Sequence, residues 1–288
     1  MMPKNLVWTW LSVLIAFSSS TSFAQSKKVI NAMSFNIRYD NPEDGPQNWH
    51  YRKDNIVRMI NFYDLDIIGM QEVLVGQLNF LKQNLSEYET IGVGREDGAT
   101  KGEYAPIFYR KNRLKTLQSG TFWLSETPNK VSKGWDADLE RIATWAIFLD
   151  KKTRKKFIFM NTHFDHRGNL ARIESAKLLK QKAMELGGDL PLILTGDFNL
   201  TPNSQGIQTL LKEDGKNTLR NTRTLATLAY GPDWTSCGFD DRPFEDREVI
   251  DYIFVKNIAE IHRYAVFAEM LNNLYLSDHC PVFAQLQL

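Results

Sequence analysis

The stretch Leu192-Ile193-Leu194-Thr195-Gly196-Asp197-Phe198-Asn199 is an apolar run that ends in a carboxylate and, two residues later, an amide. Its length and composition predict a buried β-strand, and Gly196-Asp197 is typical of the turn that follows a strand. In α/β proteins the crevice that binds ligands lies at such strand ends. The stretch therefore predicts a buried sheet with polar side chains gathered at one edge.

Five other apolar runs end in, or contain, a side chain that can bind a metal or move a proton. These side chains are Asn36, Glu72, His163, Asp251 and the pair Asp278-His279. Singly, each has an ordinary structural explanation, such as the start of a loop for Asn36 or a hydrogen-bonded core position for His163. Together they offer oxygen ligands, an amide and two imidazoles, which suit a hard divalent cation and acid–base catalysis rather than zinc or copper.

The rest of the pattern predicts one domain, because no Pro-, Gly- or Ser-rich linker divides the chain. A composition of 43% hydrophobic and 24% charged residues excludes a disordered chain. Strands are predicted at residues 29–37, 66–72, 106–110, 142–150, 157–163, 191–196, 249–255 and 282–288. Helices are predicted at residues 51–62 and 169–186. Several strands are apolar on both faces, as in a sheet covered on each side.

The first 24 residues have the pattern of a secretory signal peptide, with Lys4, an apolar run over residues 6–17 and Ser22-Phe23-Ala24 at the cleavage site. We therefore expect residues 25–288 to be exported, to the periplasm or the extracellular space, without a stable membrane anchor. The full chain has 35 Lys and Arg against 34 Asp and Glu, and removal of Lys4 leaves 34 against 34. No overall basic field marks this protein as a partner of nucleic acid.

Cys237 and Cys280 leave two readings open, a disulfide in an oxidising compartment or two buried thiols. Neither cysteine has the spacing of a zinc site. Residues 151–156 are rich in Lys and Arg and are predicted to form a solvated hairpin tip. A contact between this tip and a phosphate backbone is the alternative.

Six motifs resemble those of the endonuclease/exonuclease/phosphatase superfamily, whose fold is that of deoxyribonuclease I. They are Ser34-Phe35-Asn36-Ile37-Arg38, Gln71-Glu72-Val73, Asn161-Thr162-His163-Phe164, Gly196-Asp197-Phe198-Asn199, Ile250-Asp251-Tyr252-Ile253 and Ser277-Asp278-His279. They stand in the family's order, and the resemblance covers roughly residues 29–288. The resemblance implies an α/β (α+β) four-layer sandwich, with two mixed β-sheets packed face to face and helices outside. It also implies hydrolysis of a phosphoester that depends on Mg²⁺ or Mn²⁺.

The resemblance also implies a metal site and a water-activating group. Asn36 and Glu72 would hold the catalytic metal, and Asp278 would support that site. Asp197 would orient or deprotonate the attacking water, and Asn199 would bind a phosphate oxygen.

The remaining implied roles belong to the imidazoles and to the groups around them. His279 would work opposite Asp197, held in its tautomer and orientation by Asp251. His163 would contact the phosphate or protonate the leaving group, with Glu103 as its carboxylate partner. Arg141 would contact phosphate.

The resemblance leaves the substrate open, since members cleave DNA, RNA, inositol phosphates, phospholipid headgroups and sugar phosphates. The inositol polyphosphate 5-phosphatase branch is disfavoured, because Leu200-Thr201-Pro202 stands where that branch has a Tyr/Phe-Arg pair. The loop from Arg38 to Trp49 resembles a mostly bacterial, exported subgroup, and we expect it to shape the substrate site through these two residues. A purely structural loop is the alternative. His166 is expected to add a substrate contact.

Three functions are therefore weighed. The first is a hydrolase of a small or lipid- or sugar-linked phosphoester, which fits the absence of net charge. The second is a secreted DNA or RNA endonuclease or exonuclease, with Lys133, Arg141 and residues 151–156 as a local basic strip. The third is a non-catalytic phosphoester-binding protein, which predicts missing site residues, and none is missing. A monomer is expected.

Overall fold

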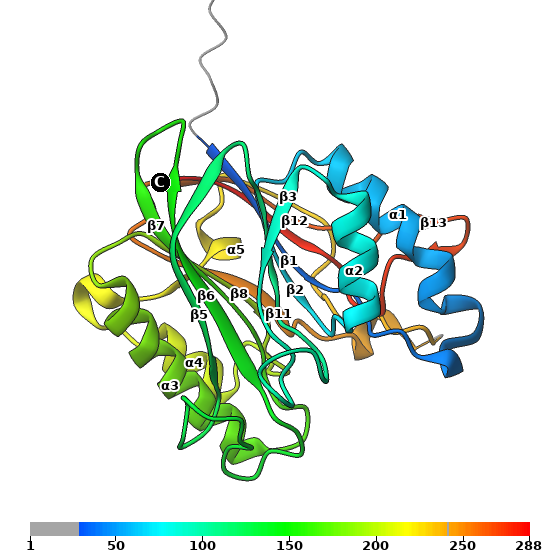
Figure 1. Ribbon diagram of the computed structural model, residues 1–288, viewed down its shortest axis with the longest axis horizontal. Helices are drawn as coiled ribbons and strands as arrows, with labels where there is room; N and C mark the ends of the chain where they lie inside the picture. The colour runs from blue at the N-terminus through cyan, green and yellow to red at the C-terminus, as the bar shows by residue number, and fades with distance from the viewer. Residues whose placement is uncertain (1–28, 241) are drawn as a thin grey trace, which may run out of the picture.

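The computed structural model describes residues 29–240 and 242–288 (Figure 1). The predicted signal peptide, residues 1–24, lies outside the described residues. No helix within the described ranges is both long enough and apolar enough to cross a membrane.

The described chain forms two large sheets. The first has the strand order β10 (Leu228–Tyr230), β12 (Glu260–Val266), β15 (Val282–Gln287), β1 (Val29–Asn36), β2 (Ile67–Gln71), β4 (Ile107–Arg110) and β3 (Tyr88–Ile91). The second has the order β5 (Leu114–Trp123), β6 (Ile142–Asp150), β7 (Lys156–His163), β8 (Leu192–Asp197), β11 (Asp251–Lys256) and β9 (Arg220–Asn221). Both are mixed, because β1 and β2 run parallel, as do β7 and β8, while most other neighbours are antiparallel. The short pair β13 (Met270–Leu271) and β14 (Leu274–Tyr275) stands apart.

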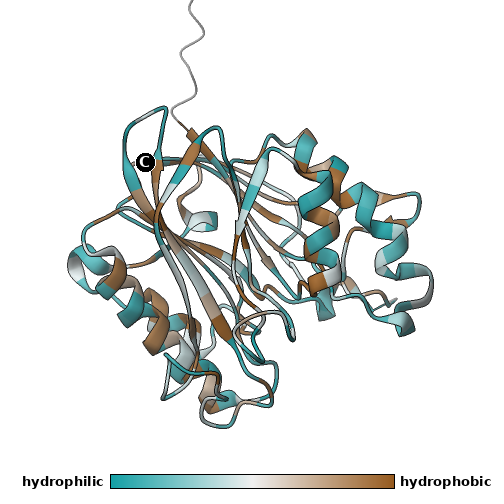
Figure 2. Cartoon of the chain, viewed as in Figure 1, coloured by the Kyte–Doolittle hydropathy of each residue, from teal (hydrophilic) through white to brown (hydrophobic). Residues whose placement is uncertain are grey.

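The sheets pack face to face, and helices cover their outer faces. Ile30 and Ala32 of β1 meet Phe157 and Phe159 of β7 in the apolar layer between the sheets. Helices α1 (Trp49–Phe62) and α2 (Val75–Asn84) pack on the first sheet, and α3 (Asn169–Gly187) and α4 (Gln205–Leu211) pack on the second. Figure 1 shows these helix pairs on opposite flanks, and Figure 2 shows that each carries a hydrophilic outer side. The expected four-layer sandwich is confirmed.

Short helical turns complete the fold. They are η1 (Pro42–Gln47), η2 (Gly215–Asn217), α5 (Thr222–Leu225) and η3 (Phe244–Asp246). The most important for the site is η1, which occupies the loop that follows β1. Asn41 caps it through Oδ1, which accepts a hydrogen bond from the N–H of Glu43.

The strands change from apolar to polar along their inner faces. In β1 the inward series runs Ile30, Ala32, Ser34 and Asn36, and all four residues are buried. β7 and β8 change in the same direction, towards His163 and Asp197. Because side chains alternate between faces in a strand, one face can be hydrophobic core at one end and functional site at the other.

A buried polar cluster joins the sheets where this change occurs. Gln71 Nε2 donates to Asn161 Oδ1 at 2.6 Å, and Thr195 Oγ1 donates to the same oxygen at 3.0 Å. Asn161 Nδ2 donates to the carbonyl of Met70 at 2.7 Å. A Cβ on Gly69 would lie only 2.1 Å from Thr195 Oγ1, so this position has no room for a side chain. The cluster fixes the two sheets relative to each other one layer below the strand ends.

The predicted strands are all present, with ends that differ from the predictions by no more than two residues. The helix predicted at residues 51–62 begins two residues earlier, at Trp49, because Asn48 Oδ1 accepts a hydrogen bond from the N–H of His50. Among elements of four or more residues in the two sheets and the four helices that cover them, the sequence analysis missed β3, β5, β12, α2 and α4. β5 lies at a sheet edge and is exposed over much of its length, so it lacks an apolar pattern.

Residues 151–156 form the predicted hairpin tip between β6 and β7, and it lies at the strand ends opposite Asn36 and His163. Lys155 Nζ donates to the backbone oxygen of Leu288 at 2.6 Å, beside the end of β15. Figure 1 shows this hairpin near the C-terminus. The predicted basic strip from Arg141 to residues 151–156 is therefore wrong. Arg141 precedes β6 and residues 151–156 follow it, so the length of β6 separates them.

Cys237 and Cys280 are buried free thiols in this structure. Cys237 Sγ donates to the carbonyl of Ser277 at 3.3 Å. A hydrogen bond with Cys237 and burial both raise the pKa of the Cys280 thiol, so Cys280 stays a neutral, unreactive thiol.

Candidate active site

The polar strand ends meet in a pocket of about 400 Å³, which we call the active-site pocket. Its lining residues are Arg38, Tyr39, Glu72, Glu103, Leu139, Arg141, His163, His166, Asp197, Asn199, Asp278 and His279. Asn36 and Asp251 do not line it but hydrogen-bond to residues that do. Of the thirteen predicted site residues, only Trp49 lies away from this group.

Glu72, Asp197 and His279 form the densest group of metal-binding atoms. One ligand atom from each lies within 4.8 Å of the other two. Asn36 bridges the two carboxylates, since its Nδ2 donates to Glu72 Oε1 at 2.9 Å and to Asp197 Oδ2 at 3.0 Å. Its oxygen accepts a hydrogen bond from the N–H of Arg38 instead of facing the carboxylates. Glu72 is common to this group and to the expected ligand set, and Asn36 of that set lies against both carboxylates of the group.

The buried carboxylates here have raised pKa values, which is expected where a cation binds. Burial, and after it the carboxylate of Asp251, raises the pKa of Asp197. Burial also raises the pKa of Asp278, and the charge of Glu72 adds to this effect. Crowded buried carboxylates are costly without positive charge among them. A hard divalent cation fits this donor set, because it supplies that charge and prefers carboxylate oxygens.

His279 is held by a carboxylate behind it. Its Nδ1 lies 2.9 Å from Asp251 Oδ2, and its Nε2 lies 3.8 Å from Asp197 Oδ2. Burial alone would lower the pKa of His279, but these two carboxylates outweigh burial and raise the pKa well above its usual value. The ring is therefore an imidazolium pointing into the pocket near neutral pH.

His163 is the opposite case. Its Nε2 lies 3.4 Å from Asp197 Oδ2, and its buried Nδ1 lies 3.6 Å from Glu103 Oε2 without a hydrogen bond. Burial, and after it the charge of Arg141, lowers the pKa of His163 to about 3. A neutral imidazole can donate a hydrogen bond to a phosphate oxygen but is a poor proton donor to a leaving group. The surroundings therefore favour the first of its two expected roles.

Arg141 lies at the start of β6 with one guanidinium nitrogen unused. Nε is 3.5 Å from Asp165 Oδ2, and Nη2 is 3.1 Å from His166 Nδ1. Nη1 is buried and has no hydrogen-bond partner within the described chain, although Glu103 Oε2 is 4.0 Å away. An unpaired buried donor of a permanently charged group suits an anionic oxygen of a ligand.

Arg38 forms the other positive wall of the pocket. It pairs with Asp44 of η1 through two hydrogen bonds of 2.9 and 3.0 Å, and this pairing raises the pKa of its guanidinium. Its Nη1 also lies 3.7 Å from Asp278 Oδ2. The loop after β1 therefore contributes a fixed positive charge beside the carboxylates.

Three site residues have left-handed backbone conformations that non-glycine residues rarely adopt. Arg38 has φ 57°, Glu72 has φ 59° and Asn199 has φ 48°. Each lies one or two residues beyond the end of a strand, so the unusual φ turns its side chain relative to the alternation of that strand. Asn199 is fixed by its N–H, which donates to Asp197 Oδ1, and by Nδ2, which donates to the carbonyl of Phe164. Such strain is typical of functional sites.

The expected contact of Trp49 with substrate is corrected by the structure. Trp49 is the first residue of α1, is only 5% exposed and packs edge-on against Phe80. The helix that begins at Asn48 turns the indole into the layer between α1 and α2. Tyr39, in the loop that follows β1, lines the pocket instead.

Sequence reasoning missed two residues that support the site. Arg95 pairs with Glu103 at 2.7 Å and is nearly buried, and nothing in its surrounding sequence marks it. Asp165 accepts hydrogen bonds from the N–H groups of Arg167 and Gly168 and holds Arg141. An acidic residue just before a glycine and a predicted helix is a signal for such a turn, and it was available in the sequence.

Comparison with known proteins agrees with this geometry. A model of the Endonuclease/Exonuclease/phosphatase family matches residues 33–279, which include every motif that carried the resemblance. The chain belongs to the endonuclease/exonuclease/phosphatase family. Enzymes of this family hydrolyse phosphoester bonds and typically depend on a divalent metal, and the protein is a phosphoesterase of this kind.

Two solved structures and one sequence relative of this family place the chain more closely. An endonuclease/exonuclease/phosphatase from Bacteroides vulgatus is 46% identical, with a TM-score of 0.87 over 90% of this chain and 99% of its own. A mannosyl-6-phosphatase from Bacteroides thetaiotaomicron is 38% identical, with a TM-score of 0.83 over 90% of this chain and 100% of its own. An uncharacterized protein of Acanthamoeba polyphaga mimivirus is 26% identical, covering 81% of this chain and 90% of its own length.

Proposed function

We propose that the protein is a phosphatase or phosphodiesterase that hydrolyses a small, sugar-linked phosphoester with the help of Mg²⁺ or Mn²⁺. The observation that carries this proposal is the form of the active-site pocket. It encloses about 400 Å³ and brings two guanidinium groups, Arg38 and Arg141, to one group of carboxylates. That arrangement suits one phosphate on a small body. The similarity to a mannosyl-6-phosphatase supports the sugar.

The metal would be held around Glu72 and Asp197, with Asp278 beside them and Asn36 behind, while the charged ring of His279 lies next to this group without binding the metal. When bound, a divalent cation supplies positive charge that offsets the negative charge of the phosphate and of the transition state. Glu72 is the ligand on which the sequence and the geometry agree. A site with few protein carboxylates leaves room for substrate oxygens, as Mg²⁺ sites usually do.

The side chains divide the remaining work between them. Asp197, with its raised pKa, orients the attacking water and accepts its proton. His279, kept positive by Asp251, stabilises negative charge on the phosphoryl group. His163 donates a hydrogen bond from its neutral ring, and Asn199 and Arg141 bind phosphate oxygens. In this scheme no described side chain other than the imidazolium is placed to protonate a leaving group.

A nuclease is the second candidate, and the distribution of charge speaks against it. Residues 151–156 are at the far end of the strands, and His166 and Arg167 pair with Asp138 at the pocket rim. Lys133 is exposed near the rim, but a single lysine does not make a track for a phosphate backbone. The same chemistry would also fit a lipid-linked phosphoester, and the experiment below includes such a substrate.

The proposal is tested by incubating the purified protein with phosphoesters and Mg²⁺ or Mn²⁺. Hydrolysis is followed as inorganic phosphate from monoesters, as freed alcohol from diesters and as nicking of plasmid. The substrates are hexose 6-phosphates, a sugar-linked phosphodiester, a phospholipid headgroup ester and supercoiled plasmid. We expect turnover of a sugar-linked ester and no nicking of the plasmid. Nicking without release from any sugar ester would make the protein a nuclease, and turnover of the headgroup ester alone would make the substrate lipid-derived.

The matched variants are Asp197→Ala and Asp189→Ala. Asp189 is an exposed carboxylate paired with Lys216 on the surface, far from the described site. We expect the first variant to lose activity by a factor of about 100 or more, and the second to retain it. Equal activity in Asp197→Ala would show that the measured turnover comes from a contaminant or from another site.

We also propose that the protein is exported, as its first 24 residues suggest. Fractionation of cells that make the full chain would place it in the periplasm or the medium, and a mass spectrum of that material would show whether cleavage precedes Gln25. Recovery of the uncleaved chain in the cytoplasm alone would contradict this proposal.

A further inference from the structure

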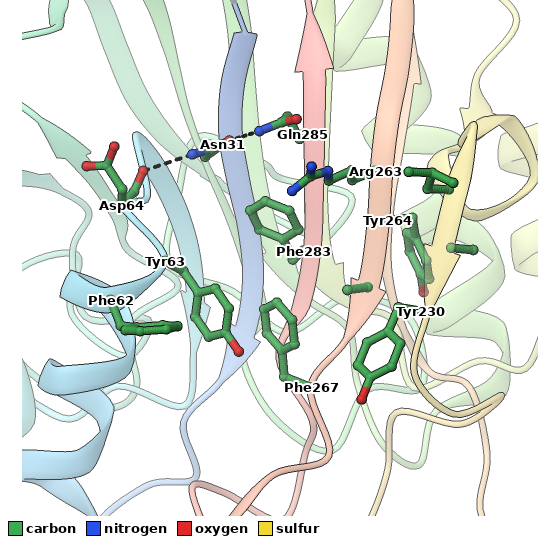
Figure 3. A pocket seen from close by; sticks show the side chains of 13 residues that line it. Asn31, Phe62, Tyr63, Asp64, Tyr230, Arg263, Tyr264, Phe267, Phe283 and Gln285 are labelled. Carbon is green, nitrogen blue, oxygen red and sulfur yellow. Dashed lines mark hydrogen bonds between the residues drawn. The ribbon is translucent and has the colours of Figure 1, made fainter. Parts of the chain in front are cut away.

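A second hollow, of about 470 Å³, lies on the outer face of the first sheet and shares no lining residue with the active-site pocket. We call it the outer pocket (Figure 3). It spans β1, β15, β12 and β10 beside the end of α1. The helices α1 and α2 pack on the β1–β2–β4–β3 side of this sheet and leave the outer pocket open.

The sheet register explains why a hollow forms here. Phe283 of β15 pairs with Ala265 of β12, and Ala265 pairs in turn with Tyr230 of β10. All three side chains point to the outer face, so a methyl group stands between two large rings. Because Ala265 is small, it leaves a space between the rings of Phe283 and Tyr230.

The walls of the outer pocket are aromatic. The ring of Tyr63 stacks on Phe267, with centroids 4.1 Å apart and planes at 11°, and Phe267 lies 5.8 Å from Phe283. At the rim, Phe62 is 81% exposed and Tyr230 is 78% exposed. Figure 3 shows these rings gathered around the hollow. Large exposed aromatic side chains beside a concave surface are characteristic of ligand sites.

One end of the outer pocket is polar. Asn31, Gln285 and Arg263 are cross-strand partners in a row next to the aromatic one. Gln285 Nε2 donates to Asn31 Oδ1 at 3.0 Å, and Asn31 Nδ2 donates to the carbonyl of Asp64 at 3.0 Å, as the dashed lines in Figure 3 mark. These contacts hold the amides flat beside the guanidinium. Asp64 also lines the pocket, and its carboxylate pairs with Arg110, with Arg110 Nη2 3.0 Å from Asp64 Oδ1.

We propose that the outer pocket binds a pyranose residue of a neutral glycan. A pyranose has apolar C–H faces that pack on aromatic rings, and its edge carries hydroxyl groups that both donate and accept hydrogen bonds. The rings supply the first surface, and the row of amides and guanidinium supplies partners for the second. Aromatic rings and amides outnumber the charged groups in this lining, which favours an uncharged ligand over a phosphate or a nucleic acid.

This site is separate from catalysis. Asn31 points to the outer face of β1, whereas Asn36, at the other end of that strand, points inward to the active site. A sugar bound in the outer pocket therefore does not react, and it holds the protein on a glycan. The inference goes beyond the proposed function and needs only binding, so its test does not depend on any phosphoesterase activity.

The test is native electrophoresis of the purified protein in gels that contain soluble α-mannan, β-glucan or xylan. We expect at least one of these neutral polysaccharides to retard the protein, and a simple methyl hexoside to relieve the retardation. Tyr230→Ala removes one wall, and Ala265→Phe fills the hollow. We expect each variant to weaken binding tenfold or more. Tyr51→Ala, at an exposed tyrosine of α1 outside the outer pocket, is the matched control and should bind normally.

Three outcomes would overturn the proposal. They are no retardation by any neutral polysaccharide, equal retardation of Tyr230→Ala and the unchanged protein, and binding to anionic polymers only. A dimer that Tyr230→Ala disrupts, in a protein that binds no sugar, would instead make this surface a contact between copies. Ala265→Phe adds bulk to a packed strand, so its melting temperature is compared first. Tyr230→Ala changes an exposed side chain and decides the question even if Ala265→Phe unfolds.

Discussion

At the scale of single residues, two histidines in one pocket have opposite electrostatics. Both rings lie near Asp197, but His163 also faces the guanidinium groups of Arg141 and Arg95, whereas His279 also faces Asp251. Both rings are buried, so the sign of the neighbouring charges decides which ring carries a proton. The sequence predicted that both histidines belong to the site. It did not assign their charges, because Arg95 lies in a stretch with no motif and reaches His163 only through the fold.

The pair of Asp251 and His279 gives the first prediction. Asp251→Asn removes the charge that raises the pKa of His279 but keeps the shape and one hydrogen-bonding oxygen. We expect kcat to fall about 100-fold, because the ring loses its positive charge and its fixed orientation. The circular dichroism spectrum should remain unchanged. A variant with normal kcat would show that His279 does not act as a charged ring.

Asp165 gives a prediction about pH and stability. Burial alone would raise its pKa, but the N–H groups of Gly168 and Arg167 and the charge of Arg141 lower the pKa below its usual value. A carboxyl with a lowered pKa in the folded state stabilises the fold above its unfolded pKa, about 4, and loses that contribution as the pH falls through the folded pKa. Asp165→Asn should therefore reduce the free energy of unfolding by about 2 kcal/mol at pH 7.

Urea unfolding at several pH values checks this prediction. The gap between the unchanged protein and Asp165→Asn should be full at pH 7 and should narrow below pH 4. The control is Asp189→Asn, at an exposed carboxylate outside the site, which should change stability much less. A gap for Asp165→Asn that stays constant down to the lowest measurable pH would contradict the role assigned to its charge.

At the scale of elements, the site depends on how two sheets are joined. β1 and β2 of the first sheet bring Asn36 and Glu72, while β7, β8 and β11 of the second bring His163, Asp197 and Asp251. Apolar runs and their polar ends predicted these strands, because both faces of a covered sheet must be apolar. The same reasoning missed β5 and β12, whose exposed faces break the pattern. It also missed the join itself, since contacts between Gly69 and Thr195 cross 126 residues of chain.

The close contact between the sheets at Gly69 predicts the effect of adding a single methyl group there. In Gly69→Ala the new Cβ would lie 2.1 Å from Thr195 Oγ1 and 2.4 Å from Asn161 Oδ1. The sheets must shift or the polar cluster must break, at a cost of about 2 kcal/mol of unfolding free energy. Because the strand ends would shift as well, we expect activity to fall further than stability alone explains.

Gly76→Ala is the matched control for this prediction. Gly76 lies in α2, and a Cβ there would meet no atom within 4 Å. Alanine is favoured over glycine inside a helix, so this variant should be unchanged or more stable by up to about 1 kcal/mol. Thermal and urea unfolding measure both variants. Equal stability of Gly69→Ala and the unchanged protein would show that the space between the sheets adapts easily.

At the scale of the whole molecule, the site lies at one end of the hydrophobic core, and the packing of that core does not involve the site residues. The three large apolar clusters fill the layers between the sheets and under the helices, and none contains an active-site carboxylate or histidine. The four-layer arrangement could be inferred from the sequence through its six motifs. The position of residues 151–156 could not, because charge along a sequence does not show at which end of a sheet it falls.

Metal removal should therefore stop catalysis and leave the fold. With a chelator we expect activity to vanish while circular dichroism stays unchanged. Mg²⁺ at about 100 times its dissociation constant should raise the stability by about 2.7 kcal/mol, measured as a higher melting temperature. Glu72→Gln should lose this increase, whereas Glu185→Gln, at an exposed position of α3, should keep it. If Mg²⁺ does not change the melting temperature of the unchanged protein, the cation does not bind at this carboxylate group.

The ends of the described chain lie together on the side away from the active-site pocket. Val29 opens β1 and pairs with Gln287, and Leu288 meets the hairpin through Lys155. A linker joined to Leu288 would therefore leave the pocket mouth free. Fixed to a bead or an electrode by that end, the enzyme should keep its KM for a small ester, while attachment through Arg167 at the rim should raise it. The fold thus provides a natural handle for orienting the protein on a support.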